Sequence, residues 1–352
     1  MHHTQRRFLD ELLTTPSPSG YETRGQRVWV DYVSEFADDV RTDAYGNAVA
    51  VHEGSGDGPE LAFAGHADEI GYIVRRVDEE GFVRIGAIGG ADRTVSKGQH
   101  VTIHADEPVH GVVGQTAIHL RNSDDELENI EKQHVDVGAT SSEEAESLVE
   151  VGDPVTVSST VQDLHGTRVA ARGMDNRVGT WCAAEGLRLA VEADVDATVY
   201  AVSTVQEEVG LRGARMVGFD LAPDAVVAVD VGHATDSPDV KSEHRNGVSL
   251  GGGPVVSRGS ANHPVVVDLA RRAAREADIE IQLEARGSAT GTDADAFYTQ
   301  RGGVPSLNVS VPNRYMHTPV EVVDTDDLDD IAALFGAMAE QVGDIESFAV
   351  NI

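Results

Sequence analysis

The apolar positions in the first part of the chain follow two different spacings. Apolar residues at helical spacing predict helices over residues 4–13 and 22–36, and the proline-containing segment 16–20 separates them. The short apolar runs at 48–51 and 61–64 are bounded by glycine and polar residues, which predicts strands buried in a sheet. We therefore expect the chain to begin with two helices followed by strands.

Predicted helices and strands alternate in the second half of the chain. The predicted helices cover residues 177–191, 263–277 and 326–342, and the predicted strands cover residues 198–205, 225–231 and 306–311. Such alternation is typical of an α/β fold, in which helices cover a sheet. A chain of 352 residues is long enough for two domains.

The segment 71–164 has a different pattern, with short alternating apolar and polar runs separated by glycines. This pattern predicts a mostly β module. Within it, residues 124–131 predict a loop or short helix, and Ser141 with Glu144 predicts a brief capped helix that ends near Val149. Residues 1–70 and 165–352 would then form one catalytic domain, with residues 71–164 inserted into it.

Composition narrows the range of partners. The formal net charge is −33, from 60 acidic and 27 basic residues, so a compact chain has a strongly negative surface. Nucleic acid and anionic membranes are therefore not expected as partners. Only three of the basic residues are lysine, and an acid excess with so little lysine indicates a halophilic protein. Because 40% of the residues are hydrophobic, the charge does not indicate disorder.

The single cysteine indicates the type of thiol, and the first residues bear on the cellular location. Cys182 lies in an apolar run without a neighbouring base, which predicts a buried, inert thiol. The first residues lack the apolar run of a signal peptide, and no later stretch approaches 18 continuous apolar residues. We expect a cytoplasmic protein.

Histidines and carboxylates follow four of the predicted strands. They are His66 and Asp68 after 61–64, Glu207 and Glu208 after 198–205, Asp230 near the end of 225–231, and His317 shortly after 306–311. Ligands of open α/β sheets bind beyond the carboxyl ends of the strands. One such residue alone is usually a cap or loop residue, but four coincidences with complementary donors predict a metal site.

Two further features of the sequence allow more than one interpretation. Glu207 and Glu208 would repel each other after a buried strand unless a cation or a proton intervenes. Asp175 lies directly before a predicted helix, where an aspartate commonly caps the helix. His165 and His233 lie near the donors, but we leave both out because they fall at a probable hinge and in a probable turn.

The donors lie in a set of ordered motifs. The motifs are Gly65-His66-Ala67-Asp68-Glu69-Ile70-Gly71, Met174-Asp175-Asn176-Arg177, Gln206-Glu207-Glu208-Val209-Gly210, Asp230-Val231-Gly232-His233 and Tyr315-Met316-His317-Thr318, with Leu250-Gly251-Gly252-Gly253-Pro254 and Gly291-Thr292-Asp293-Ala294. These motifs resemble those of the TET aminopeptidases, also called the glutamyl or deblocking aminopeptidase family of di-metal peptidases. The similarity covers essentially the whole chain.

The resemblance implies roles for seven residues and two divalent metal ions, for which zinc, cobalt and manganese are the candidates. His66 and Asp230 would bind one ion, Glu208 and His317 the other, and Asp175 both. Glu207 would be the general base for the metal-activated water, and Asp68 would steady His66. The resemblance also implies a mixed sheet flanked by helices, a β-rich insertion that pairs subunits, and a dodecamer built from dimers that trims peptides.

Other functions remain open at this stage. A two-metal carboxypeptidase or N-acyl amino acid deacylase on the same fold would need a cation for the substrate carboxylate, and Arg258, Arg286 or Arg314 could supply it. The sequence gives less support to a glycosidase. Glycosidases need two carboxylates that face each other across the scissile bond, and adjacent residues such as Glu207 and Glu208 point to opposite faces of a strand. A scaffold without activity is not favoured, since all the donors are present. For an aminopeptidase we expect preference for neutral, leucine-like N-terminal residues.

Overall fold

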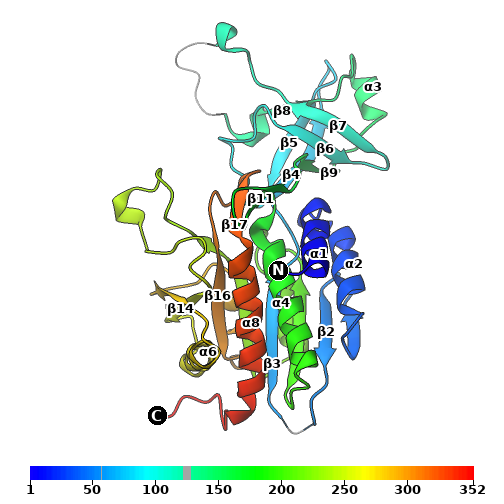
Figure 1. The fold of residues 1–352 in the computed structure, drawn as a ribbon. Helices are drawn as coiled ribbons and strands as arrows, with labels where there is room; N and C mark the ends of the chain where they lie inside the picture. Colours follow the sequence, from blue (N-terminus) through cyan, green and yellow to red (C-terminus); the bar gives the residue numbers. More distant parts are fainter. Residues whose placement is uncertain (57, 122–127) are drawn as a thin grey trace.

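The structure is a computed structural model that describes residues 1–56, 58–121 and 128–352. Its largest element is an eight-stranded mixed sheet (Figure 1). In spatial order the strands are β1 (Asp39–Thr42), β2 (Ala48–His52), β12 (Thr198–Thr204), β3 (Glu60–His66), β13 (Ala225–His233), β16 (Ser306–Asn313), β14 (Val255–Gly259) and β15 (Gln282–Arg286). The four central strands, from β12 to β16, are parallel to one another.

Helices cover both faces of this sheet. On one face lie α1 (His3–Thr14), α2 (Thr23–Val33), α4 (Met174–Glu192), α6 (Pro264–Glu276) and α8 (Thr325–Gln341). On the other face lie α5 (Arg212–Asp220) and α7 (Asp293–Phe297). Alternate residues of β3 explain the two layers, because Leu61 and Phe63 pack in one core and Ala62 and Ala64 in the other. The predicted α/β fold is confirmed.

A closed β-barrel stands at one end of the sheet domain (Figure 1). Its strands are β4 (Gly71–Val77), β5 (Val83–Ile88), β8 (His134–Asp136), β7 (Pro108–Val113), β6 (His100–His104) and β9 (Pro154–Val157), in that order. Buried residues such as Val74, Ile85, Ile103 and Val155 fill its interior. The mostly β character predicted for this segment is confirmed.

Short helices accompany the barrel. They are η1 (Ile118–Leu120), η2 (Ile130–Lys132) and α3 (Ser142–Glu146). The Ser141 hydroxyl caps α3 by accepting a hydrogen bond from the Glu144 N–H at 3.2 Å, as predicted, although the helix ends a turn before Val149. The loop or short helix predicted over 124–131 lies partly outside the described residues, and η2 forms its end.

A small three-stranded sheet lies between the barrel and the large sheet (Figure 1). It contains β10 (Gln162–Asp163), β11 (Arg168–Ala171) and β17 (Glu321–Asp324), and the remaining short helices are η3 (Ser242–His244) and η4 (Val342–Asp344). The barrel strands thus begin at Gly71 and end at Val157. The boundaries of the inserted module, 71 and 164, stay a prediction.

Among the described residues, no helix combines the length and the apolar character that crossing a bilayer requires. Cys182 is buried in α4, as the sequence predicts.

Candidate metal centre

The predicted donors meet at one edge of the large sheet. Because β12, β3 and β13 are parallel, their carboxyl ends lie at the same edge. His66 is the last residue of β3, Asp230 lies in the carboxyl-terminal half of β13, and Glu207 follows β12 by three residues. The sheet therefore brings together three side chains that are far apart in the sequence.

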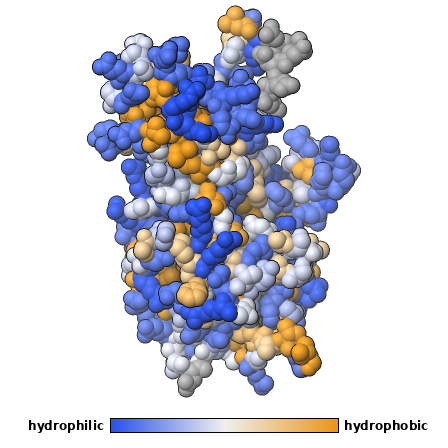
Figure 2. Space-filling view, turned by 180° about the vertical axis from the view of Figure 1, so that it is seen from behind, coloured by the Kyte–Doolittle hydropathy of each residue, from blue (hydrophilic) through white to orange (hydrophobic). Residues whose placement is uncertain are grey.

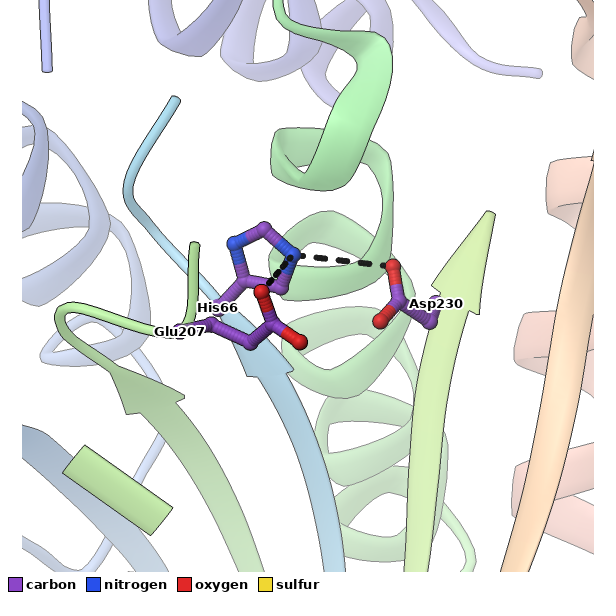
Figure 3. A group of neighbouring side chains, drawn as sticks. All are labelled: His66, Glu207 and Asp230. Atoms are coloured by element: carbon purple, nitrogen blue, oxygen red, sulfur yellow. Dashed lines mark ion pairs between the residues drawn. The ribbon is translucent and has the colours of Figure 1, made fainter. Parts of the chain in front are cut away.

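His66, Glu207 and Asp230 form what we call the first donor group. Figure 3 shows the three side chains pointing toward one another from β3, β13 and the loop after β12. His66 Nε2 lies 3.6 Å from Asp230 Oδ1 and 3.8 Å from Glu207 Oε2. All three side chains are buried, and each offers an atom within 4.8 Å of the other two.

Asp175, Glu208 and His317 form the second donor group, by the same 4.8 Å criterion. His317 Nε2 lies 3.2 Å from Asp175 Oδ2 and 3.6 Å from Glu208 Oε1. Asp175 Oδ1 lies 3.2 Å from His66 Nε2, so the two oxygens of Asp175 face different groups. This carboxylate therefore joins the two donor groups.

Asp175 is not the capping residue that its position suggested. The backbone angles of Asp175 and Asn176 are not helical, and Asn176 caps the regular helix, because its Oδ1 accepts a hydrogen bond from the Gly179 N–H at 3.1 Å. The regular helix accordingly begins near Arg177, where the sequence predicts it, and the Asp175 side chain is free to face the two histidines.

Asp68 is fully buried beside the first donor group. Its Oδ1 lies 3.3 Å from His66 Nδ1 and accepts a hydrogen bond from the Glu207 N–H at 2.9 Å. Its Oδ2 accepts hydrogen bonds from the Glu208 N–H at 3.1 Å and from the Ser19 hydroxyl at 2.6 Å. Asp68 thus holds both the His66 ring and the loop that carries the two glutamates.

Glu321, which we did not predict as a site residue, has a comparable place in the second donor group. This buried carboxylate begins β17 and accepts hydrogen bonds from the His317 N–H at 2.9 Å and the Asp175 N–H at 3.3 Å. It thus ties together two segments that are far apart in the chain. A glutamate directly before the apolar pair Val322 and Val323 was the only sequence signal available.

Two other buried acids near the donors were also missed. Glu69 pairs with the guanidinium groups of Arg172 and Arg177, which hold the pKa of Glu69 down at about 2 although burial alone would raise it. Asp293 accepts a hydrogen bond from the Thr204 hydroxyl at 2.5 Å, and burial raises the pKa of Asp293 to about 7. Asp293 lies in a motif that the resemblance included without a role.

The histidines left out of the prediction lie outside both donor groups. His165 and His233 are exposed.

Crowding of carboxylates dominates the electrostatics. Burial raises the pKa of Glu207 to about 10, and repulsion from Asp230 adds to this while His66 opposes it. Burial likewise raises the pKa values of Glu208 and Asp230. For Asp175, hydrogen bonds from the two histidines outweigh burial and lower the pKa. The centre contains more negative charge than its own histidines neutralise.

These residues fit a pair of divalent cations. Imidazole nitrogens and carboxylate oxygens are the donors that zinc, cobalt and manganese accept in proteins. Glu208 Oε1 is buried and has no hydrogen-bond donor, which leaves it available to a cation. Two cations would also relieve the repulsion that raises the pKa of the carboxylates. The geometry alone permits Glu207 to act as a ligand or as a base.

The chain is similar to known aminopeptidases. Residues 46–334 match the family model described as M42 glutamyl aminopeptidase. The chain is 34% identical over 341 residues to the lysyl aminopeptidase of Pyrococcus furiosus, covering 95% of this chain and 96% of the relative.

Solved structures agree with the whole fold. The chain is similar to the TET aminopeptidase of Thaumarchaeota archaeon SCGC AB-539-E09, with a TM-score of 0.90, 28% identity and 96% coverage of both chains. It is also similar to the TET1 peptidase of Pyrococcus horikoshii, with a TM-score of 0.84 and 30% identity over 95% of this chain and 99% of that one. The latter can assemble into a tetrahedron or a large octahedral shell.

Proposed function

The chain belongs to the M42 glutamyl aminopeptidase family of metal-dependent peptide hydrolases, and from this premise we propose that it releases N-terminal residues from peptides with two divalent cations and a glutamate base. The observation that carries the proposal is the position of Asp175. Its two carboxylate oxygens lie 3.2 Å from His66 Nε2 and 3.2 Å from His317 Nε2, as a carboxylate shared by two cations requires.

In this proposal His66 and Asp230 would hold one cation, Glu208 and His317 would hold the other, and Asp175 would be a ligand of both. When bound, the two cations acidify a shared water and stabilise the negative charge that develops on the peptide carbonyl. Zinc or cobalt suits these donors, and manganese is a further candidate.

Glu207 moves the proton in this proposal. It takes a proton from the attacking water and passes it to the nitrogen of the leaving amine. Asp68 supports this role because it holds the Glu207 N–H at 2.9 Å and so fixes the loop from which the carboxylate projects. Cations beside Glu207 would lower its raised pKa, since positive charge favours the carboxylate form.

The arginines that a carboxypeptidase or deacylase would need are engaged elsewhere or exposed. Arg314 donates to both carboxylate oxygens of Asp236, at 2.7 and 2.5 Å, and Arg286 pairs with Glu284 at 3.0 Å. Arg258 is exposed. These contacts favour release of residues with a free N-terminus over recognition of a substrate carboxylate.

A small cavity of about 40 Å³ beside Asp175 and His317 supports a preference for neutral N-terminal residues. Ile70, Tyr72, Val95, Val157 and Pro319 line it. Glu69, Arg172 and Glu321 line it as well, but Glu69 and Arg172 pair with each other and Glu321 accepts two backbone hydrogen bonds. Asp92 also lines the cavity, but both of its carboxylate oxygens accept hydrogen bonds from Thr94. The Pyrococcus furiosus relative is called a lysyl aminopeptidase, so leucyl, lysyl and glutamyl substrates should be compared directly. Fastest turnover of the leucyl substrate is expected.

The barrel supports assembly into a homo-oligomer, which we propose to be a dodecamer built from dimers. In the view of Figure 2 much of the surface is hydrophilic, and hydrophobic residues gather on the upper part, where the barrel lies, and at the lower right. Among the described residues of segment 71–164, the exposed large hydrophobic residues are Val112, Ile118, Leu120, Leu148, Val151 and Leu164. The pairing role of the barrel, a cytoplasmic location and adaptation to high salt stay predictions.

The proposed function is tested with leucyl p-nitroanilide in high salt. Chelation should abolish hydrolysis, and adding back single metals should restore it. Glu207→Gln should lower kcat by about 10²- to 10⁴-fold, the range of general acid–base catalysis, with unchanged metal content. The exposed Glu53→Gln is the matched control. Full activity after chelation, or in Glu207→Gln, would contradict the proposal, as would cleavage restricted to N-terminally blocked peptides.

A further inference from the structure

A turn of the barrel lies directly against the second donor group. The turn consists of Gly89 and Gly90, which follow the barrel strand β5. The Gly90 carbonyl oxygen lies 3.1 Å from Nδ1 of His317. A carbonyl oxygen can only accept a hydrogen bond, so His317 Nδ1 must be the protonated nitrogen. The other nitrogen, Nε2, then faces Asp175 and Glu208 with its lone pair available to a cation.

The turn also leaves little space around these ligands. A Cβ atom at Gly90 would lie 2.8 Å from His317 Nδ1 and 2.9 Å from Cε1 of the same ring. A Cβ atom at Gly89 would lie 3.2 Å from both Cβ and Oε2 of Glu208. The absence of side chains in the turn therefore lets the barrel approach two donors of the second group closely.

The first donor group has different neighbours. The contacts of His66 within the described residues are with Asp68, Asp175, Glu207 and Asp230, all outside the barrel segment. His66 and Asp230 are held by neighbouring strands of the large sheet. Among the described residues of the barrel, those of the Gly89–Gly90 turn thus contact the second donor group, and none forms an ion pair with His66.

From this arrangement we infer that the Gly89–Gly90 turn is a positioning element of the second cation site, so that the affinity for one of the two cations depends on the barrel. The inference rests on the proposed function and extends it. Gly90 sets the protonated nitrogen and the direction of the His317 ring through its carbonyl group, and the turn confines the ring and Glu208 through close packing. An inserted module would in this way take part in metal binding as well as in any assembly.

The variant Gly90→Ala tests the inference. Gly90 is exposed and its backbone lies outside the left-handed region, so alanine fits the backbone while its methyl group displaces the His317 ring. Partners that orient a metal-bound histidine typically contribute 10- to 100-fold in affinity. Calorimetric titration of the full-length protein with Co²⁺ should therefore show one site weakened by about 10- to 100-fold and the other within about twofold of wild type.

Three comparisons make the result specific. Gly287→Ala is the matched control, because a Cβ atom there meets no other atom within 4 Å, and it should bind Co²⁺ as wild type does. His317→Ala should weaken the same site more strongly. In the His317→Ala background, Gly90→Ala should cause no further weakening of the second Co²⁺ site, since Gly90 acts on that site mainly through His317. Circular dichroism at each step checks that the variants are folded.

Several outcomes would overturn the inference. Two Co²⁺ sites of wild-type affinity in Gly90→Ala would do so, as would equal weakening of both sites or an additive loss in the double variant. A wild-type protein that binds no Co²⁺ would instead remove the proposed function, and the inference with it. The visible absorption of bound Co²⁺ provides an independent readout, because displacement of His317 should change the spectrum of one ion only.

Discussion

The two donor groups contain similar chemical groups but are built in different ways. His66 and Asp230 belong to adjacent parallel strands, and the first group is almost fully buried. The second group comes from the start of α4 and from two loops, and the side chain of His317 is 33% exposed. The sheet itself fixes the first group, whereas hydrogen bonds that Glu321 and the Gly90 carbonyl accept from His317 fix much of the second. A fold can thus supply half of a metal centre directly and the other half through supporting contacts.

Removing one histidine from each group is the strongest test of the difference between the two groups. We expect His66→Ala to weaken the first Co²⁺ site by more than about 100-fold, beyond the range of supporting residues, and to abolish peptide hydrolysis. His317→Ala should abolish hydrolysis but leave one tightly bound Co²⁺. Calorimetry and elemental analysis after gel filtration measure both effects. Loss of both ions in His317→Ala would show that the two groups are not separable.

The buried Glu69 connects the two groups and should control acid stability. It follows the His66–Asp68 segment, while its partners Arg172 and Arg177 flank Asp175 in the sequence. Its pKa is lowered from 4.5 to about 2, so its stabilisation is complete above pH 4.5 and is lost as the pH falls toward 2. The difference corresponds to about 3 kcal/mol of unfolding free energy.

Urea unfolding between pH 7 and 2.5, at fixed salt and protein concentration, measures this contribution. Glu69→Gln should be less stable by about 3 kcal/mol at pH 7, because two buried guanidinium groups lose their partner. The gap between wild type and variant should narrow below pH 4.5. A constant gap across this range would contradict the assignment.

Glu321→Gln tests a supporting contact of the second donor group and should have a smaller effect than the loss of a histidine. The amide side chain retains one acceptor oxygen, so it cannot hold both the Asp175 and the His317 N–H groups as the carboxylate does. We expect one Co²⁺ site to weaken by about 10- to 100-fold, with hydrolysis restored at high metal concentration. The exposed Glu340→Gln on α8 should bind Co²⁺ normally. Equal effects of the two variants would exclude a positioning role for Glu321.

The smallest effect is expected for a substitution that removes one supporting hydrogen bond of the first donor group. Ser19→Ala removes one hydrogen bond to Asp68, which retains its contacts with His66 and with the N–H groups of Glu207 and Glu208. The unfolding free energy should fall by about 1 kcal/mol and both Co²⁺ affinities should stay near wild type. Ser34→Ala, whose hydroxyl donates to the Val30 carbonyl oxygen on an exposed surface, is the control. A large loss of Co²⁺ affinity would show that the first donor group depends on this hydrogen bond as well as on the sheet.

The contrast between the groups also explains what the sequence could predict. Donors that follow apolar strands are recognisable, because parallel strands place their carboxyl ends together, and His66, Glu207 and Asp230 were found in this way. The resemblance alone gave Asp175 its bridging role, since its position before a helix also suited a cap. The roles proposed for all these residues stay predictions until the variants are measured.

Supporting residues were harder to predict. Glu321 acts through backbone N–H groups of segments distant in sequence, and nothing in its own neighbourhood indicates these partners. The strand order of the barrel, with β8 between β5 and β7, depends on long-range pairing that periodicity does not specify. Short elements such as α7 and β17 were missed because four or five residues show too little of a repeating pattern.

The contact between the Gly89–Gly90 turn and the second donor group should restrict the exchange of barrels between members of the family. A chimera that receives the barrel of another family member would also receive a new neighbour for His317 and Glu208. We expect such grafts to stay active only where the incoming turn has a glycine at position 90 and the carbonyl group in the same place. Changes of sequence in the barrel would therefore be constrained by the chemistry of the ligands that the turn contacts.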